Sequence, residues 1–191
     1  MGRIVVSEFV TLDGVMEDPG GAEPFDRGGW AFQFERGAEG DKFKLDELMA
    51  ADALLLGRRT YEGFAAAWPG RTDDVGFADK MNGMPKYVVS TTMKTAEWSN
   101  STVIADDVPG AVARVRDEHT GDVLVAGSAQ LVQALVAHDL VDELRLMLFP
   151  VALGAGKRLF ADGAPRRLQV VDATRSGDVV MLTLERETAP R

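Results

Sequence analysis

The chain has 191 residues, lacks cysteine altogether and contains only two histidines. The absence of cysteine excludes disulfides, thiolate nucleophiles and cysteine-ligated metal sites. The histidines, His119 and His138, lie far apart in the sequence, and each stands in a polar segment typical of a solvated helix end. We therefore expect no metal site.

Positive charge and long apolar runs are also scarce. The chain has 21 lysines and arginines against 30 aspartates and glutamates, which gives a formal net charge of −9. A nucleic-acid surface needs clustered basic residues to neutralise phosphates, so nucleic acid is not expected as a partner. No apolar run approaches the roughly 18 residues of a membrane-spanning helix. Residues 1–8 lack the basic and apolar regions of a signal peptide, so we expect a cytoplasmic protein.

Several catalytic motifs are missing as well. The chain has no Gly-x-Ser-x-Gly elbow and no Gly-Lys-Ser/Thr loop, so nothing indicates acyl transfer by a serine triad or ATP hydrolysis. The dinucleotide fingerprint Gly-x-Gly-x-x-Gly is also absent. Acid–base chemistry remains open to Asp13, Asp41 or Asp46, although most carboxylates of so acidic a chain only solvate its surface.

The chain does contain three apolar runs, each of which ends in a turn of small or hydroxyl-bearing residues. These segments are residues 54–61, 87–92 and 123–130. Short aliphatic and β-branched runs are typical of parallel strands buried on both faces, and open α/β sheets bind ligands at the carboxyl ends of such strands. The pattern predicts a crevice for a nucleotide with at least two charged groups.

The first turn, Gly57-Arg58-Arg59-Thr60, is the most specific of the three. Glycine lets a ligand approach the backbone, and Thr60 can cap the following helix, whose N-terminus favours an anion beside the arginines. An ordinary strand-to-helix turn with two exposed arginines fits this segment equally well.

The other two turns also place polar groups at the end of a strand, in their case hydroxyl groups. Ser128 in the turn at residues 127–130 is a candidate N-cap, and Ser90 and Thr91 can bind a ribose phosphate or cap a local helical turn. Each turn alone fits ordinary capping as well as ligand binding. The three together favour a ligand site.

Strands and helices alternate through residue 138, which predicts one α/β domain over residues 1–191 with a mostly parallel sheet flanked by helices. The expected elements are strands at residues 3–10, 53–56, 86–90, 102–105 and 122–126, a helix from Asp41, and helices at residues 60–66, 110–118 and 129–138. Strand-like segments without helices between them follow at residues 143–148, 168–173 and 179–184, and predict an antiparallel extension. Loops at residues 17–40 and 67–85 are expected to form much of the substrate pocket.

In their order along the chain, these segments resemble the dihydrofolate reductase superfamily. Within it, they resemble the reductase domain of the bifunctional riboflavin-biosynthesis deaminase-reductases and its stand-alone relatives. The resemblance covers nearly the whole chain. It rests on the segments at residues 12–14, 56–61, 88–91 and 125–131 and on the Leu-Gly-x-Gly-x-x-Leu-Phe pattern at residues 153–160.

The resemblance implies a central mixed sheet with NADPH bound over its strand ends. The turn that contains Gly14 would border the nicotinamide, and the paired arginines would favour NADPH over NADH because a 2′-phosphate needs a bidentate positive partner. The residues implied for the adenosine phosphate end are Arg58, Arg59, Thr60, Ser90 and Thr91, and those implied for the pyrophosphate are Gly127, Ser128, Ala129 and Gln130.

The substrate side departs from the pattern of the family. Asp41 precedes Gly57 at a spacing comparable with that of the acidic residue in folate reductases, which makes it the candidate proton donor. The usual Pro-Trp before that helix is absent, and no basic cluster for a ribose phosphate is evident near Asp41. The zinc ligands of a deaminase domain are also missing.

The leading hypothesis is an NADPH-dependent reductase that transfers a hydride to a conjugated C=N or C=O of a pterin-, pyrimidine- or sugar-like molecule. It would be similar to 5-amino-6-(5-phosphoribosylamino)uracil reductase or to dihydrofolate reductase, with the cofactor carrying the chemistry. The alternatives are a non-catalytic nucleotide-binding or sensing protein and a purely structural homodimer. A homodimer is expected in any case, with the apolar strand at residues 144–149 as its contact.

Overall fold

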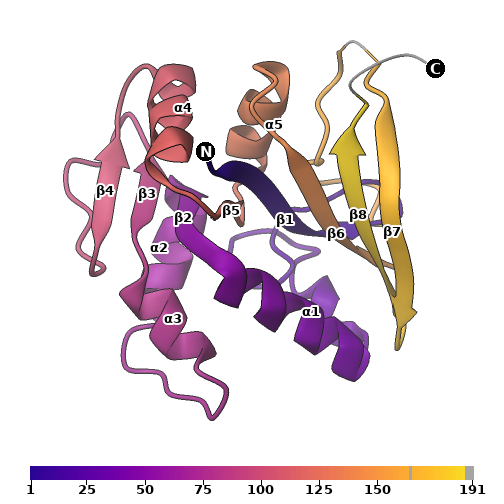
Figure 1. The fold of residues 1–191 in the computed structure, drawn as a ribbon. Helices are drawn as coiled ribbons and strands as arrows, with labels where there is room; N and C mark the ends of the chain where they lie inside the picture. Colours follow the sequence, from indigo (N-terminus) through magenta and orange to yellow (C-terminus); the bar gives the residue numbers. More distant parts are fainter. Residues whose placement is uncertain (164, 188–191) are drawn as a thin grey trace.

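The structure is a computed structural model that describes residues 1–163 and 165–187. One eight-stranded sheet runs through the molecule in the order β4-β3-β2-β5-β1-β6-β8-β7, with helices packed on it (Figure 1). The strands are β1 (Arg3–Thr11), β2 (Ala51–Gly57), β3 (Lys86–Val89), β4 (Ser101–Ile104), β5 (Asp122–Val125), β6 (Glu143–Phe149), β7 (Leu168–Ser176) and β8 (Val179–Arg186). The helices are α1 (Gly37–Ala50), α2 (Arg58–Ala67), α3 (Phe77–Gly83), α4 (Val108–Glu118) and α5 (Ala129–Ala137), preceded by a 3-10 turn at Trp30–Gln33.

The strand directions confirm the expected fold class. The six strands from β4 to β6 pair in parallel. Strand β8 pairs antiparallel with β6, and β7 pairs antiparallel with β8. Parallel strands require crossover helices, whereas antiparallel neighbours need only a tight turn, and this explains why the helices stop before residue 138.

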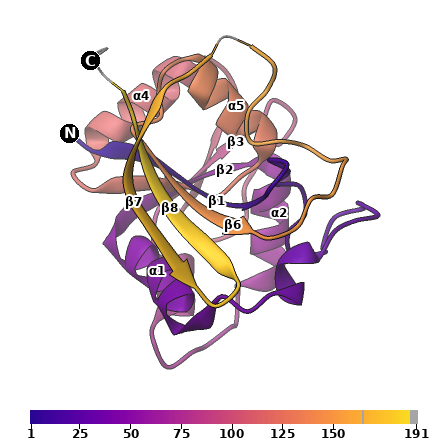
Figure 2. The same ribbon diagram turned by 90° about the vertical axis from the view of Figure 1, so that its right-hand side faces the viewer.

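Both faces of the parallel part are covered by helices, with α4 and α5 on one side and α1 on the other (Figure 2). Alternate residues of β1 supply the two cores, because successive side chains of a strand point to opposite faces. Ile4 and Val6 belong to the cluster under α4 and α5, and Val5 belongs to the cluster with Leu48 of α1 and Tyr61 of α2. The sheet is therefore buried on both faces, as its continuous apolar runs indicated.

The segment between β1 and α1 is anchored by Trp30, which is 1% exposed. Its indole N–H donates to the Glu17 carbonyl oxygen at 2.9 Å, and its ring meets Phe149 edge-on at 5.3 Å between centroids. The predicted loop at residues 17–40 therefore packs on β6 and β8 through an aromatic anchor, whereas Phe32 stays 81% exposed.

Two boundaries and one surface differ from expectation. Helix α1 begins at Gly37 rather than at Asp41, and the loop expected at residues 67–85 contains α3. The strand at residues 144–149, expected at the surface of a dimer, lies inside the sheet between β1 and β8, and Met147 and Phe149 are buried. The predicted dimer contact through this strand was therefore wrong. The antiparallel extension covers β6 and leaves β7 as the edge strand on that side of the sheet.

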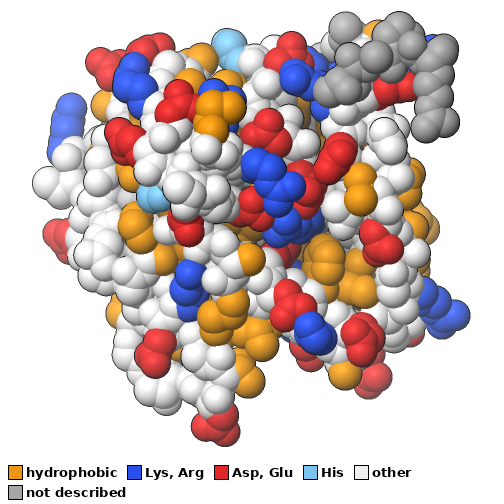
Figure 3. Space-filling view, viewed as in Figure 1, with side chains coloured by type: hydrophobic (Ala, Val, Ile, Leu, Met, Phe, Trp, Pro, Cys, Tyr) orange, Lys and Arg blue, Asp and Glu red, His pale blue; other side chains and the backbone are white. Residues whose placement is uncertain are grey.

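Charge on the surface is mixed in sign. The face shown in Figure 3 carries acidic and basic side chains interspersed, with apolar side chains between them. Among the residues that the structure describes, no helix is both long and apolar enough to cross a membrane.

Candidate functional site

The turns that follow β2 and β5 lie against each other. The Gly57 N–H donates to the Gly127 carbonyl oxygen at 2.9 Å. A Cβ on Gly57 would stand 2.3 Å from the Ser128 hydroxyl oxygen, and one on Gly127 would stand 2.7 Å from the Thr60 hydroxyl oxygen. The Gly127–Ser128 peptide bond is cis, and Gly127 has a φ of +98°. The structure thus brings together four of the predicted residues in one junction, which we call the β2/β5 junction (Gly57, Thr60, Gly127 and Ser128).

Two helices begin at the β2/β5 junction, α2 after Gly57 and α5 after Ser128. Neither N-cap residue uses its side chain to satisfy the first backbone N–H groups. Free N–H groups and the positive end of the helix dipole favour an anion at such a place. Ala129 is buried at the start of α5, whereas Gln130 is exposed beside it. The β2/β5 junction therefore offers two adjacent helix N-termini to a ligand with more than one phosphate.

The two arginines of α2 are exposed and form ion pairs that a ligand can replace. Arg58 pairs with Glu62 at 3.0 Å one turn along the helix, and Arg59 reaches Glu23 at 3.6 Å. Exposed ion pairs of this kind contribute only about 0–1 kcal/mol. Both guanidinium groups are thus available to a phosphate at the start of α2.

The turn after β3 is closed by hydrogen bonds of Ser90. The Ser90 hydroxyl oxygen accepts the backbone N–H groups of Thr92 and Met93 at 3.3 and 3.0 Å, and the Ser90 N–H donates to the Ile104 carbonyl oxygen at 3.0 Å. Thr91 is exposed. The Ser90 hydroxyl is therefore used for local hydrogen bonds, although no helical turn follows it, and the exposed Thr91 is the residue of this turn that remains a candidate for ligand binding.

The turn after β1 is fixed by Asp13. Its carboxylate accepts the Thr11 hydroxyl at 2.6 Å and the backbone N–H groups of Leu153 and Gly154 at 3.1 and 2.7 Å. These hydrogen bonds, the one from Thr11 first, lower the pKa of Asp13 to about 2. Gly14 sits in this turn with a φ of +81°. The Leu-Asp-Gly segment and the Leu-Gly-x-Gly segment of the sequence are therefore one paired loop, in which Asp13 has a structural role.

Replacing Asp13 by alanine should lower the free energy of unfolding by about 1–3 kcal/mol, because two backbone N–H groups lose a charged acceptor. The folded pKa lies below the unfolded one, so this contribution is present above pH 4 and disappears as the pH falls towards 2. Urea unfolding at pH 7 and pH 2.5 measures both. Asp26→Ala, at an exposed position of the neighbouring loop, is the control, and equal effects of the two substitutions would contradict the role of Asp13.

The structure places Asp41 away from the β2/β5 junction. Its side chain is 64% exposed near the start of α1 and forms an ion pair with Arg36 at 2.8 Å. It borders a shallow surface hollow together with Phe32 and Phe34.

A buried polar group that the sequence motifs did not single out lies between β1 and α1. The Ser7 hydroxyl donates to Glu47 at 2.6 Å and accepts from the Lys44 ammonium at 2.6 Å, and Lys44 also forms an ion pair with Glu47. The next residue of β1, Glu8, is 9% exposed, and burial raises the pKa of its carboxyl to about 8. In the sequence, the presence of Ser7 and Glu8 within an otherwise apolar strand was the signal that could have indicated these buried polar groups.

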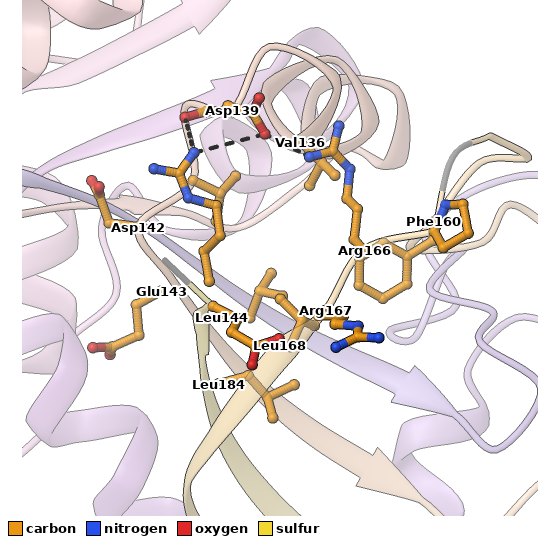
Figure 4. A pocket seen from close by; sticks show the side chains of 14 residues that line it. Val136, Asp139, Asp142, Glu143, Leu144, Phe160, Arg166, Arg167, Leu168 and Leu184 are labelled. Atoms are coloured by element: carbon orange, nitrogen blue, oxygen red, sulfur yellow. Dashed lines mark hydrogen bonds and ion pairs between the residues drawn. The ribbon is translucent and has the colours of Figure 1, made fainter. Parts of the chain in front are cut away.

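A separate hollow of about 460 Å³ lies at the far end of the molecule, where β6 and β7 begin (Figure 4). Its floor is apolar, with Leu144, Leu168 and Leu184, and at its rim Arg166 pairs with Asp139 at 2.6 Å. None of the predicted site residues lines it. The candidate site therefore remains the carboxyl edge of the parallel strands.

Comparison with known proteins agrees with this fold. Residues 3–182 match the model of the RibD C-terminal domain. The chain belongs to this reductase-like family, which confirms the resemblance carried by its motifs.

Curated relatives cover most of the chain. YwjB of Bacillus subtilis (strain 168), an uncharacterized protein, is 29% identical over 158 residues, which are 83% of this chain and 82% of the relative. YyaP of the same organism, also uncharacterized, is 29% identical over 185 residues, 94% of this chain and 93% of the relative.

Solved structures share the architecture. A putative riboflavin biosynthesis protein from Shewanella sp. PV-4 superposes with a TM-score of 0.76 at 19% identity, covering 97% of this chain and 99% of that one. A pyrimidine reductase-like protein from Corynebacterium diphtheriae gives 0.66 at 12% identity, covering 98% and 92%. RibD of Acinetobacter baumannii gives 0.68 at 16% identity, covering 98% of this chain but 58% of RibD. At these identities the likeness establishes the fold.

Proposed function

We propose that this protein is an NADPH-dependent reductase of a pterin-, pyrimidine- or related small molecule, of the kind represented by 5-amino-6-(5-phosphoribosylamino)uracil. The observation that carries the proposal is the β2/β5 junction, where two helix N-termini and two glycines meet at the carboxyl edge of the sheet. We further propose a cytoplasmic location and a homodimer, in which the exposed edge strand β7 replaces β6 as the contact.

The residues at this edge suit a phosphorylated dinucleotide. A Cβ at Gly57 or Gly127 would collide with the facing turn, so glycine at both positions lets the two turns, and with them the two helix N-termini, lie close together. The N–H groups at the start of α5 would hold the pyrophosphate, and Arg58 and Arg59 at the start of α2 would hold the 2′-phosphate. The paired loop of Asp13 and Gly14 would border the nicotinamide.

The bound cofactor would supply the hydride, and the chain would supply orientation and exclusion of water. The helix N-termini and arginines fix the phosphate end. The apolar side of β1 and the loop at residues 153–160 would hold the ring end against the substrate. Because hydride transfer depends on the distance and angle of the two reacting carbons, this positioning is the main contribution of the protein.

The direct test is a titration with NADPH and, separately, NADH, followed by quenching of tryptophan fluorescence and by energy transfer to the reduced nicotinamide. Binding should be followed by an acceptor screen with pterins and aminopyrimidines. Oxidation of NADPH by one acceptor supports the reductase. Binding without turnover by any acceptor favours the nucleotide-binding or sensing protein, and no binding of either dinucleotide contradicts both.

The double substitution Arg58→Ala, Arg59→Ala should weaken the binding of NADPH by about 10- to 100-fold and the binding of NADH by much less, because only NADPH carries the 2′-phosphate. This range corresponds to about 1.4–2.8 kcal/mol, as expected for charge-assisted hydrogen bonds. Parallel fluorescence titrations measure the ratio. Arg71→Ala, in the loop after α2, is the control, and an equal loss of both dinucleotides would overturn the assignment of the arginines.

A further inference from the structure

Strand β1 runs beyond its neighbour β5 at the carboxyl edge of the sheet. Its pairing with β5 ends at Val6, opposite Val125, whereas its pairing with β6 continues to Thr11. No other strand of residues 1–163 and 165–187 pairs with β1 along this last stretch. On that side the Glu8 carboxyl of β1 meets the backbone N–H of Gly127, so the end of β1 lies beside the β2/β5 junction.

Glu8 lies in this stretch, which pairs with β6 on one side only. One carboxyl oxygen, Oε1, is buried and has no hydrogen-bond partner among the described residues. The backbone N–H of Gly127 faces the carboxyl and favours its ionised form, but the effect of burial is larger. Buried polar atoms in folded proteins are nearly always paired, and an isolated one calls for a partner. A ligand held at the β2/β5 junction would supply that partner.

The charged groups around Glu8 do not provide it. Lys44 and Glu47, both on α1, act on the Glu8 carboxyl in opposite directions. Lys44 is bound to Ser7 and Glu47 rather than to Glu8. Helix α5, which begins beside Glu8, has no ionisable residue along its length. The carboxyl is therefore held neutral by burial and not by a dedicated acidic or basic partner.

We propose that Glu8 contacts the bound cofactor, and that its carboxyl group, in the neutral form, donates a hydrogen bond to the dinucleotide held at the β2/β5 junction. This inference rests on the proposed dinucleotide binding. A carboxylate at the same place would instead set a buried negative charge against the phosphates of the ligand. Binding is thus coupled to protonation, and the protein takes up a proton when it binds the dinucleotide above the pKa of Glu8.

The test is the apparent Kd of NADPH and of NADH between pH 6.5 and 9.5. For the natural protein, Kd should be constant up to about pH 8 and then rise about tenfold per pH unit, as one ionisation requires. NADH should show the same rise, because it lacks the 2′-phosphate that also titrates. Calorimetry at pH 9 in two buffers of different ionisation enthalpy should show uptake of about one proton.

Glu8→Gln keeps a hydrogen-bond donor and cannot ionise, so it should bind within about threefold of the natural protein at pH 7 and show no rise above pH 8. Glu185→Gln, the same substitution at an exposed position of β8, is the matched control and should retain the rise.

A pH-independent Kd in the natural protein, or a rise that survives in Glu8→Gln, would overturn the role of Glu8 while leaving the dinucleotide site intact. If the variant does not fold, the profile and proton uptake of the natural protein still decide. No binding of either dinucleotide at any pH would overturn the proposed function, and this inference with it.

Discussion

Gly57→Ala is expected to lower the free energy of unfolding by about 1–3 kcal/mol and to weaken the binding of NADPH at least tenfold. Gly57 has a φ of −73°, which any residue can adopt, so the effect is steric alone. The new Cβ would stand 2.3 Å from the Ser128 hydroxyl oxygen, which can rotate away, and 2.9 Å from the Ser128 backbone nitrogen, which cannot. The start of α5 would have to move away from the start of α2. Urea unfolding and fluorescence titration measure the two effects.

Gly63→Ala is the matched control for this substitution. Gly63 lies inside α2, and a Cβ there meets no atom within 4 Å. Alanine should therefore stabilise the helix by up to about 1 kcal/mol and leave binding unchanged. If Gly57→Ala matched Gly63→Ala in both measurements, the two turns would not be in the close contact on which the β2/β5 junction depends.

The turns that form this junction were predictable because local chemistry determines them. A buried parallel strand must be apolar throughout, and the chain that leaves it needs a small residue and then a helix start. Both requirements are visible in residues 54–61 and 123–130. The antiparallel ending was predictable for the same reason, since strand-like segments without intervening helices leave no crossover for parallel pairing.

The start of α1 was not predictable from local preference. Gly37 and Gly40 disfavour a helix, so the sequence pointed to Asp41. The structure shows a tertiary cause: the Gly40 N–H donates to the Ser176 hydroxyl at 3.1 Å, and a Cβ on Gly37 would stand 2.7 Å from that hydroxyl. Helix α1 approaches β7 so closely that only glycine fits at residue 37. The residues around α1 do not reveal this contact, because Ser176 lies far along the chain.

Buried charge was the other feature hidden from the motifs. The apolar run of β1 makes Ser7 and Glu8 conspicuous as polar residues of a buried strand, but the partners of Ser7, Lys44 and Glu47, come from a helix far along the chain. Where the parallel strands begin, Arg3 of β1 and Arg145 of β6 both form ion pairs with Asp122 of β5, at 2.9 Å in each case. Such clusters depend on strand order, which becomes known only with the fold.

Lys86→Ala is expected to lower the free energy of unfolding by about 3–5 kcal/mol. Lys86 begins β3 and is fully buried, and its ammonium donates to the carbonyl oxygens of Asn82, Met84 and Ser99 at 3.0, 2.8 and 3.1 Å. The nitrogen also lies 4.3 Å from the centre of the Trp98 ring. Alanine would leave a cavity and remove the donor that the three carbonyl groups share, although the Asn82 carbonyl oxygen would still accept the Ser99 hydroxyl at 2.9 Å.

Lys86→Met separates the two causes, because it keeps most of the volume and removes only the donors, at an expected cost of about 1–3 kcal/mol. Burial lowers the pKa of Lys86 to about 8, below its unfolded value of 10.5. Between these values the unfolded chain binds more protons, so the stability of the natural protein relative to Lys86→Met should rise with pH from 8 to 10.5. Urea unfolding at pH 7 and pH 10 measures this, with Lys94→Ala at an exposed position as the control. A Lys86→Ala protein within 1 kcal/mol of the natural one would mean that the hydrogen bonds of this ammonium do not hold the loops around β3 together.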